Sequence, residues 1–494
     1  MNDPNDAEQH LFEMEFKYET ATNSIFNGNI GEVVWKNPYE STSNSFDYTY
    51  DVMDRLKTAD YDNTGTSTRD YGLESISYDI NSNITALKRK GDHDDTANQS
   101  FDDLVYSYTG NQLLAVTDNA AMDTGFEDGN TSGDDYVYDD NGNLTEDKNK
   151  GITAIEYNHI NQPTKVTYDA NKYIEYTYAA SGAKVSQKVV DNGETTVTDY
   201  LGGFIYKDDK LQLIGHSQGR VVAEYDASET FAGYEYQYHL TDHLGNVRVT
   251  FKTEIDSTVY LATLETENTA AESPYFYNLD TRATHALANS TSGGDEAAKL
   301  DQNNLIGPAI ALRVVPGDTI DMQVNAYYEG GSGYNNTVTV NSFIAALASA
   351  FGGSSGAGGE AGAIFDGIDE AVTAGAGGVG GSGNDNVPAA YLSYILFDQN
   401  YKEIQNGYHE ISSSADLNHE LLFLNDIVVQ EPGYLYIYTS MQSNTALPVY
   451  FDDLRVSHTH SPVVQKDDYL PFGLSFNSYS RAAITAQNFK FNAG

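Results

Sequence analysis

The stretch that decides the fold is Tyr-Val-Tyr-Asp-Asp-Asn-Gly-Asn-Leu, residues 136–144. Its two tyrosines stand at alternate positions, so both rings lie on one face of an extended strand. The Asp, Asn and Gly residues that follow are those that tight turns favour, and Leu144 begins a returning strand. The stretch therefore predicts a β-hairpin with one aromatic face.

The same pattern recurs along the first half of the chain. An aromatic or apolar residue is followed two positions later by tyrosine, then by a polar turn, and by a returning strand six positions after the tyrosine. The second tyrosine of each copy falls at residues 50, 78, 108, 138, 157 and 178. A single hairpin cannot bury its aromatic face, so we expect successive hairpins to pair side by side. These tyrosines are then structural, because the ring packs while the hydroxyl stays hydrogen-bonded.

Composition and charge limit the classes of function. The 494 residues include 38 Tyr, 43 Gly, one Trp and no Cys, which favours strands and turns and excludes disulfides and cysteine nucleophiles. The formal net charge is −45, from 27 basic and 72 acidic residues. Such a chain repels phosphates, so we expect no nucleic-acid partner. The first ten residues are acidic and do not have the apolar core of a signal peptide.

From about residue 256 the tyrosine repeat gives way to evenly spaced apolar runs. The turn pairs Pro316-Gly317, Asn406-Gly407 and Pro432-Gly433 separate them. This spacing predicts an antiparallel jelly roll or β-sandwich. The expected strands cover residues 309–315, 319–328, 390–398, 421–429, 434–440 and 448–459.

A glycine-rich insertion at about residues 341–388 interrupts these strands. Residues 352–383 hold 13 of the 43 glycines. Within it, Ile364, Ile368 and Ala371 share one helical face, but Gly367 weakens that helix by about 1 kcal/mol. We expect a flexible insertion with one or two marginal helices, extruded from the sandwich.

Three segments carry a resemblance to a known family. They are the Asn-Gly-Asn-Leu turn at 141–144, DHLGNVRVTF at 242–251, and DDYLPFGLSFNSYSR at 467–481, which FKFNAG at 489–494 follows. In these segments the chain resembles the RHS/YD-repeat proteins of bacteria. The resemblance implies a ribbon of β-hairpins that spirals into a hollow shell around a variable C-terminal toxin. The closing segment of that family's core is missing, so we expect a truncated core and part of a shell.

The expected organisation is all-β. Residues 1–255 form the YD-repeat ribbon, 256–460 the jelly-roll sandwich, and 461–494 the start of the RHS core. The resemblance implies a non-enzymatic scaffold of a secreted or cell-surface protein, with a C-terminal toxin domain as its partner and no membrane span. As an alternative, residues 260–267 and 449–456 resemble the first and last strands of jelly-roll carbohydrate-binding modules. That reading predicts a neutral glycan or a cell-surface protein as partner.

Four carboxylates form a candidate calcium site. Asp452 and Asp453 lie on the expected last strand, and Glu265 and Glu267 lie on the first, which neighbours it in a jelly roll. Carboxylate oxygens from both strands could share one Ca²⁺ ion. The plainer interpretation is a set of exposed edge carboxylates or a turn cap. No other cofactor is expected.

Two further motifs have structural interpretations beside chemical ones. Residues 215–219 fit G-x-S-x-G, whose Ser217 would be a hydrolase nucleophile at a sharp turn from a strand into a helix. The flanking residues are strand-like on both sides, so we expect a hairpin turn and no catalytic residue, with the hydrolase as an unfavoured alternative. His458 and His460 share one strand face and could form a metal pair, but the sequence offers no third ligand at a telling spacing. In DHLGNVR we expect Asp242 and Arg248 to be structural polar groups around a turn.

Overall fold

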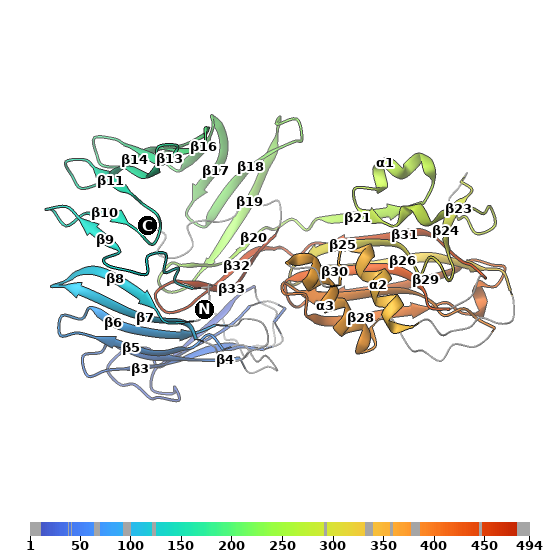
Figure 1. Ribbon diagram of the computed structural model, residues 1–494, viewed down its shortest axis with the longest axis horizontal. Helices are drawn as coiled ribbons and strands as arrows, with labels where there is room; N and C mark the ends of the chain where they lie inside the picture. The colour runs from blue at the N-terminus through green and yellow to red at the C-terminus, as the bar shows by residue number, and fades with distance from the viewer. Residues whose placement is uncertain are drawn as a thin grey trace. The chain divides into compact units, whose positions relative to one another are not determined.

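The computed structural model describes residues 11–481 except 38, 41, 64–69, 92–99, 121–124, 291–293, 331–338, 356–358, 377–385 and 444–446. The chain is mainly antiparallel β-structure, as the sequence predicts (Figure 1). It divides into two compact units. The first holds the chain up to Thr253 together with Val463–Ser478, and the second holds Glu254–Pro462 with the short segment that starts at Tyr479.

The first hairpins of the first unit pair in strict sequence order. Eight strands form one sheet: β1 (Glu13–Lys17), β2 (Glu32–Lys36), β3 (Asn44–Tyr50), β4 (Leu56–Asn63), β5 (Leu73–Tyr78), β6 (Ile84–Lys90), β7 (Ser100–Thr109) and β8 (Gln112–Asp118). A separate two-stranded sheet follows, made of β9 (Tyr136–Tyr138) and β10 (Leu144–Asp147). The hairpin ribbon is therefore present, but its ladder is broken into consecutive sheets.

A twelve-stranded sheet continues the ribbon. Its strands, in order, are β11 (Ala154–Tyr157), β12 (Pro163–Asp169), β13 (Lys172–Tyr178), β14 (Lys184–Asp191), β15 (Glu194–Leu201), β16 (Phe204–Lys207), β17 (Lys210–His216), β18 (Gly219–Tyr225), β19 (Phe231–Thr241), β20 (Val247–Phe251), β32 (Val463–Tyr469) and β33 (Ser475–Ser480). Val249 on β20 pairs with Lys466 on β32. The ribbon thus resumes after the second unit, and β32 and β33 are its last two strands. Residues 482–494, which include FKFNAG, lie outside the description.

In four of the six repeat copies the Asp or Asn residue after the tyrosine holds the turn, whereas Thr109 and Ala179 follow Tyr108 and Tyr178. Asp139 Oδ1 accepts hydrogen bonds from the backbone N–H groups of Asn141 and Asn143, at 2.8 and 2.9 Å. Gly142, at the fourth turn position, has a φ of +82°, which glycine adopts without strain. This is a type I turn closed by a left-handed residue. The same pair of bonds recurs at Asp51, Asp79, Asn158, Asp226 and Asp242.

The repeat tyrosines tie each hairpin to the preceding one. The hydroxyl of Tyr138 on β9 donates to the carbonyl of Leu113 on β8 at 2.9 Å, and that of Tyr157 on β11 donates to Leu144 on β10 at 2.6 Å. These two bonds cross the two gaps between the sheets, where the backbone ladder lapses. Equivalent bonds to backbone carbonyls are made by Tyr50, Tyr78, Tyr108, Tyr178, Tyr225 and Tyr469.

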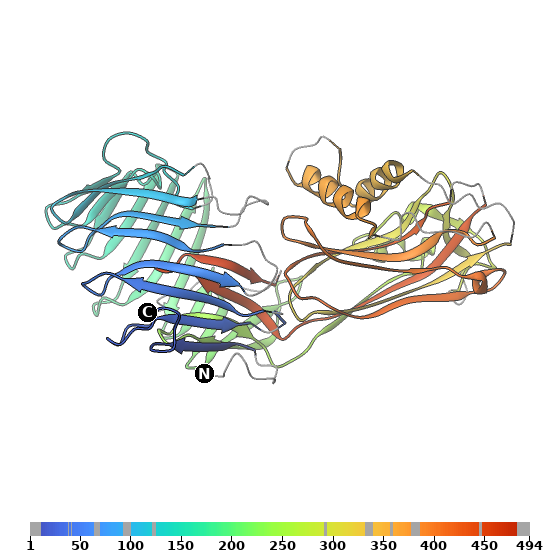
Figure 2. The same ribbon diagram turned by 90° about the horizontal axis from the view of Figure 1, so that it is seen from below.

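The two ends of the ribbon pack against each other. The ring of Phe476 on β33 meets those of Trp35, Phe46 and Tyr61, with centroids 5.8–6.5 Å apart. In Figure 2 the first strands, β1–β4, and the last, β32 and β33, lie side by side. The first unit therefore curves back on itself.

A buried charge network joins DHLGNVR to DDYLPFG. The Arg248 guanidinium bonds to the Asp468 carboxylate, and Lys466 Nζ lies 2.8 Å from Asp468 and 2.8 Å from Glu40. The side chains of Arg248, Lys466 and Asp468 are 7%, 2% and 0% exposed. Asp242 caps its turn and Arg248 holds this network, so the structural roles expected for both are confirmed.

The second unit is a sandwich of two antiparallel sheets. One has the order β23 (Arg282–Thr284), β24 (Glu296–Leu300), β31 (Val449–Thr459), β26 (Thr319–Tyr328) and β29 (Glu420–Val428), and β21 (Ser257–Ala262) also pairs with β31. The other has the order β22 (Phe276–Tyr277), β25 (Ile306–Val314), β30 (Gly433–Met441), β27 (Ala390–Asp398) and β28 (Glu403–Glu410). Short helical turns are η1 (Thr266–Asn268), α1 (Thr269–Glu272), η2 (Leu279–Thr281) and η4 (Ser413–Ala415). The first and last strands are neighbours, as expected of a jelly roll.

Two expectations for the sandwich are wrong. Asn406 and Gly407 lie inside β28 rather than in a turn. Glycine is needed there for close packing, because a Cβ on residue 407 would meet the Tyr394 ring at 2.7 Å. The turn lies earlier, where Asp398 accepts the N–H groups of Asn400 and Lys402.

The insertion is also packed rather than extruded. Helices α2 (Val340–Ala350) and α3 (Glu360–Thr373) bury Phe343, Leu347 and Ile368 against Phe397 and Tyr436 of the five-stranded sheet. The expected apolar face of α3 is real. Gly367 permits close approach, because a Cβ there would lie 2.1 Å from the Tyr401 carbonyl oxygen. No helix in the described part of the chain is long and apolar enough to span a membrane.

We predict that Tyr138→Phe and Tyr157→Phe each lower the free energy of unfolding of the first unit by about 0.5–1.5 kcal/mol, because each removes one hydrogen bond. The chain has one tryptophan, Trp35, and its side chain is 1% exposed, so its fluorescence reports unfolding of this unit. Tyr106→Phe is the control, since the Tyr106 hydroxyl has no hydrogen bond to any described residue. Equal losses in all three variants would contradict the role of the hydroxyl bonds.

Candidate functional site

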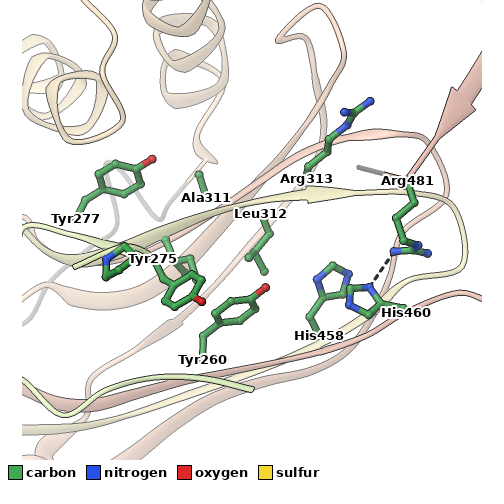
Figure 3. A pocket seen from close by; sticks show the side chains of 11 residues that line it. Tyr260, Tyr275, Tyr277, Ala311, Leu312, Arg313, His458, His460 and Arg481 are labelled. Atoms are coloured by element: carbon green, nitrogen blue, oxygen red, sulfur yellow. Dashed lines mark hydrogen bonds between the residues drawn. The ribbon is translucent and has the colours of Figure 1, made fainter. Parts of the chain in front are cut away.

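A pocket of about 350 Å³ opens in the second unit. Tyr260, Tyr275 and Tyr277 line one part of it, and His458, His460 and Arg481 line another (Figure 3). The Tyr260 and Tyr275 rings meet edge to face with centroids 5.3 Å apart. Tyr275 and Tyr277 are 54% and 44% exposed, so their rings are open to a ligand. The pocket therefore joins aromatic faces to a cationic and imidazole corner.

Strand pairing builds the polar corner of this pocket. His458 and His460 lie at alternate positions at the end of β31, and their ring centroids are 4.0 Å apart. Ile320 on β26 pairs with His458, which brings Asp318, just before β26, to the same place. His458 Nε2 lies 2.8 Å from Asp318 Oδ2. Sequence reasoning found the two histidines but missed Asp318 and Arg481. The register of β26 with β31 brings Asp318 there, and Arg481 arrives from the chain after β33.

The electrostatics of the corner favour an ionised carboxylate and a neutral imidazole. Burial alone would raise the pKa of Asp318, but hydrogen bonds from His458 and Arg481 lower it to about 2. Burial, with the neighbouring His458 and Arg481, lowers the pKa of His460 to about 4. Since Arg481 Nη1 donates to His460 Nδ1 at 2.8 Å, that nitrogen carries a lone pair.

The four predicted calcium ligands are placed as follows. Glu265 is buried and accepts from Asn289 Nδ2 at 2.6 Å, whereas Glu267 is exposed on η1. Asp452 is buried and Asp453 is half-buried, and both accept from the Ser290 hydroxyl, at 2.9 and 2.7 Å. Two consecutive loop residues therefore contact these carboxylates: Asn289 binds Glu265, and Ser290 binds Asp452 and Asp453.

These carboxylates fit a calcium ion only in part. Burial and the nearby Asp453 raise the pKa of Asp452 to about 7, so an ionised Asp452 is costly there without a cation. Glu265 and Asp452, however, already accept hydrogen bonds from Asn289 and Ser290. Among the described residues, the metal-ligand group that comes within 4.8 Å is Asp318, His458 and His460 instead.

The G-x-S-x-G motif is a hairpin. β17 ends at His216 and β18 begins at Gly219, so Ser217 lies in the turn between two antiparallel strands. The backbone N–H of Gln218 donates to His216 Nδ1 at 3.2 Å. The strand-to-helix turn of a nucleophile elbow is not formed here.

Comparison with known proteins gives no family. No protein-family model and no curated protein matches the chain. Solved structures with some likeness include TcdB2-TccC3-Cdc42, which is 11% identical with a TM-score of 0.18 over 51% of this chain and 19% of that chain. The C-terminal family 22 carbohydrate-binding module of Clostridium thermocellum Xyn10B is 11% identical with a TM-score of 0.19, over 46% of this chain and 99% of that one. TmCBM61 in complex with β-1,4-galactotriose is 8% identical with a TM-score of 0.18, over 41% of this chain and 88% of that one. These proteins are β-rich like this chain, and the comparison favours none of them.

We predict that Asp452→Asn stabilises the second unit at pH 8 by about 1–4 kcal/mol, because one pKa unit corresponds to about 1.4 kcal/mol and the variant removes a buried charge. If calcium binds at this cluster, millimolar Ca²⁺ raises the melting temperature of the unaltered chain and leaves that of Asp452→Asn unchanged. Calorimetric melts with calcium and with chelator measure both effects. If the unaltered chain gives the same melting curve with calcium and with chelator, calcium does not bind at this site.

Proposed function

We propose that the chain is a non-enzymatic structural scaffold of an exported RHS/YD-repeat protein, forming part of a β-shell that carries or encloses a C-terminal toxin. The observation that supports this proposal is the ribbon of hairpins, each tied to the preceding one by a tyrosine hydroxyl. Such a ribbon is quasi-one-dimensional, so it can be lengthened hairpin by hairpin into a wall. A protein of this kind acts in the secreted or cell-surface compartment.

The polar residues of the repeats also support a scaffold. Asp139 and Asp242 accept backbone N–H groups within their own turns, and Arg248 bonds to the buried Asp468. Their side chains are used to shape turns and join strands. The chemistry of the repeats is therefore enclosure and contact rather than turnover.

The scaffold proposal predicts protection of an attached polypeptide. An unstructured, trypsin-sensitive polypeptide joined after Gly494 should be cleaved more slowly than the same polypeptide joined before Met1, which is the matched control. Gel electrophoresis over a digestion time course measures both rates. Cleavage at one rate in the two fusions would count against a wall that shelters its C-terminal cargo.

We propose glycan binding as a second candidate function for the sandwich. The aromatic pocket supports it, because exposed tyrosine rings next to a few polar groups are typical of small-ligand sites. A neutral glycan is the expected ligand, since the chain carries a net charge of −45.

Glycan binding predicts a ligand on a glycan array that Tyr275→Ala loses. Tyr408→Ala is the control, because Tyr408 is 48% exposed on β28, away from the pocket residues. Isothermal titration with the ligand found on the array would measure the loss. Silence on arrays of neutral glycans, with and without calcium, would oppose this candidate.

A further inference from the structure

Asp318, His458 and His460 form a compact set of metal-ligating side chains. Each offers one ligand atom, and the three atoms lie within 4.8 Å of one another. Ligand atoms bound to one four-coordinate zinc ion at about 2.0–2.2 Å lie about 3.3–3.6 Å apart, so the side chains must close in by at most about 1.5 Å to complete the set. Two imidazole nitrogens and one carboxylate oxygen are a donor set that transition-metal dications prefer over calcium or magnesium.

The fold holds the carboxylate in place before any ligand arrives. Asp318 Oδ1 accepts the backbone N–H of Ser461 at 2.8 Å, and Oδ2 accepts that of Val315 at 3.1 Å. Asp318 is 0% exposed and His458 is 2% exposed. Such outer contacts orient metal ligands and reduce the entropy lost on binding.

A cation already faces these three groups. Arg481 Nη2 donates to Asp318 Oδ1 at 2.8 Å, and Nη1 donates to His460 Nδ1 at 2.8 Å (Figure 3). The guanidinium therefore uses the carboxylate charge and the imidazole lone pair that a metal ion would use. Because His458, His460 and Arg481 line the pocket, water could reach a fourth coordination position.

We propose that Asp318, His458 and His460 form a binding site for a zinc-type dication, which competes with the Arg481 guanidinium for the same atoms. Zinc needs a lone pair on the coordinating nitrogen of His458, so a coordinating Nε2 would give up its hydrogen bond to Asp318 Oδ2. Since the two cations exclude each other, zinc displaces the Arg481 side chain from Asp318 and His460. By the same coupling, the Arg481 contacts weaken zinc binding. The zinc proposal does not rest on the scaffold or on glycan binding, although its site forms the polar corner of the pocket considered for glycans.

The test uses the full chain after chelator treatment. Titration calorimetry with Zn²⁺ should show one site per chain, whose affinity falls at least about tenfold in His460→Gln and rises about tenfold in Arg481→Met, within the usual range of coupled binding. His285→Gln, which alters another histidine of the same unit, is the control and should bind as the unaltered chain does. Because His460 is half-buried, this variant is less disruptive than one at Asp318.

Cobalt provides a second readout. Co²⁺ bound to the three side chains and water should give the intense visible absorption of a four-coordinate site, and His458→Gln should abolish it. The proposal is overturned if His460→Gln binds zinc as tightly as the unaltered chain, or if Arg481→Met binds it no more tightly. Binding of Ca²⁺ in preference to Zn²⁺ at these residues would also overturn it.

Discussion

The hydrogen bond from each repeat tyrosine to a backbone carbonyl of the preceding hairpin is the interaction on which the ribbon depends. The strand pairs β8 with β9 and β10 with β11 do not belong to one sheet, and isolated backbone bonds, from Asp135 to Leu114 and between Asp147 and Ile152, cross these two gaps. Tyr138 and Tyr157 bridge those two gaps through their hydroxyls. Phenylalanine would pack equally well but would leave the carbonyl without this donor. This explains why tyrosine, rather than phenylalanine, stands at these repeat positions.

Local chemistry made the ribbon predictable from sequence. The turn after Tyr138 depends on residues within five positions, so its signal is contained in the stretch itself. Tyr225 follows the same pattern and was overlooked, although Tyr225-Asp226 could have revealed it. Tyr469 was harder to recognise from the sequence, because the residue two positions before it is the polar Asp467, where the repeat has an aromatic or apolar residue. The helices of the insertion were predicted but their packing was missed, since their partner is a sheet face formed by strands distant in sequence.

The polar corner of the pocket shows where sequence reasoning ends. The spacing of His458 and His460 is local and was recognised. Their third partner, Asp318, depends on the pairing of β26 with β31, a register set by the burial of Met322, Val324 and Phe451 in the core. Arg481 follows the last strand of the ribbon. A cluster assembled from such distant segments leaves no spacing signature.

The buried charges of the first unit give a physical reason why the ribbon can hold an inserted sandwich. Arg248 and Lys466 lie on the adjacent strands β20 and β32, one before the insertion and one after it, and both contact Asp468. A wrong partner for β20 would leave these charges buried and unpaired, at a cost of about 3–5 kcal/mol. The entropy cost of closing a loop rises only slowly with its length, so a long segment between β20 and β32 is tolerated. The sandwich that forms this segment has its own hydrophobic core. The charge network therefore selects the one pairing that restores the ribbon, and this accounts for the joint occurrence of DHLGNVR and DDYLPFG.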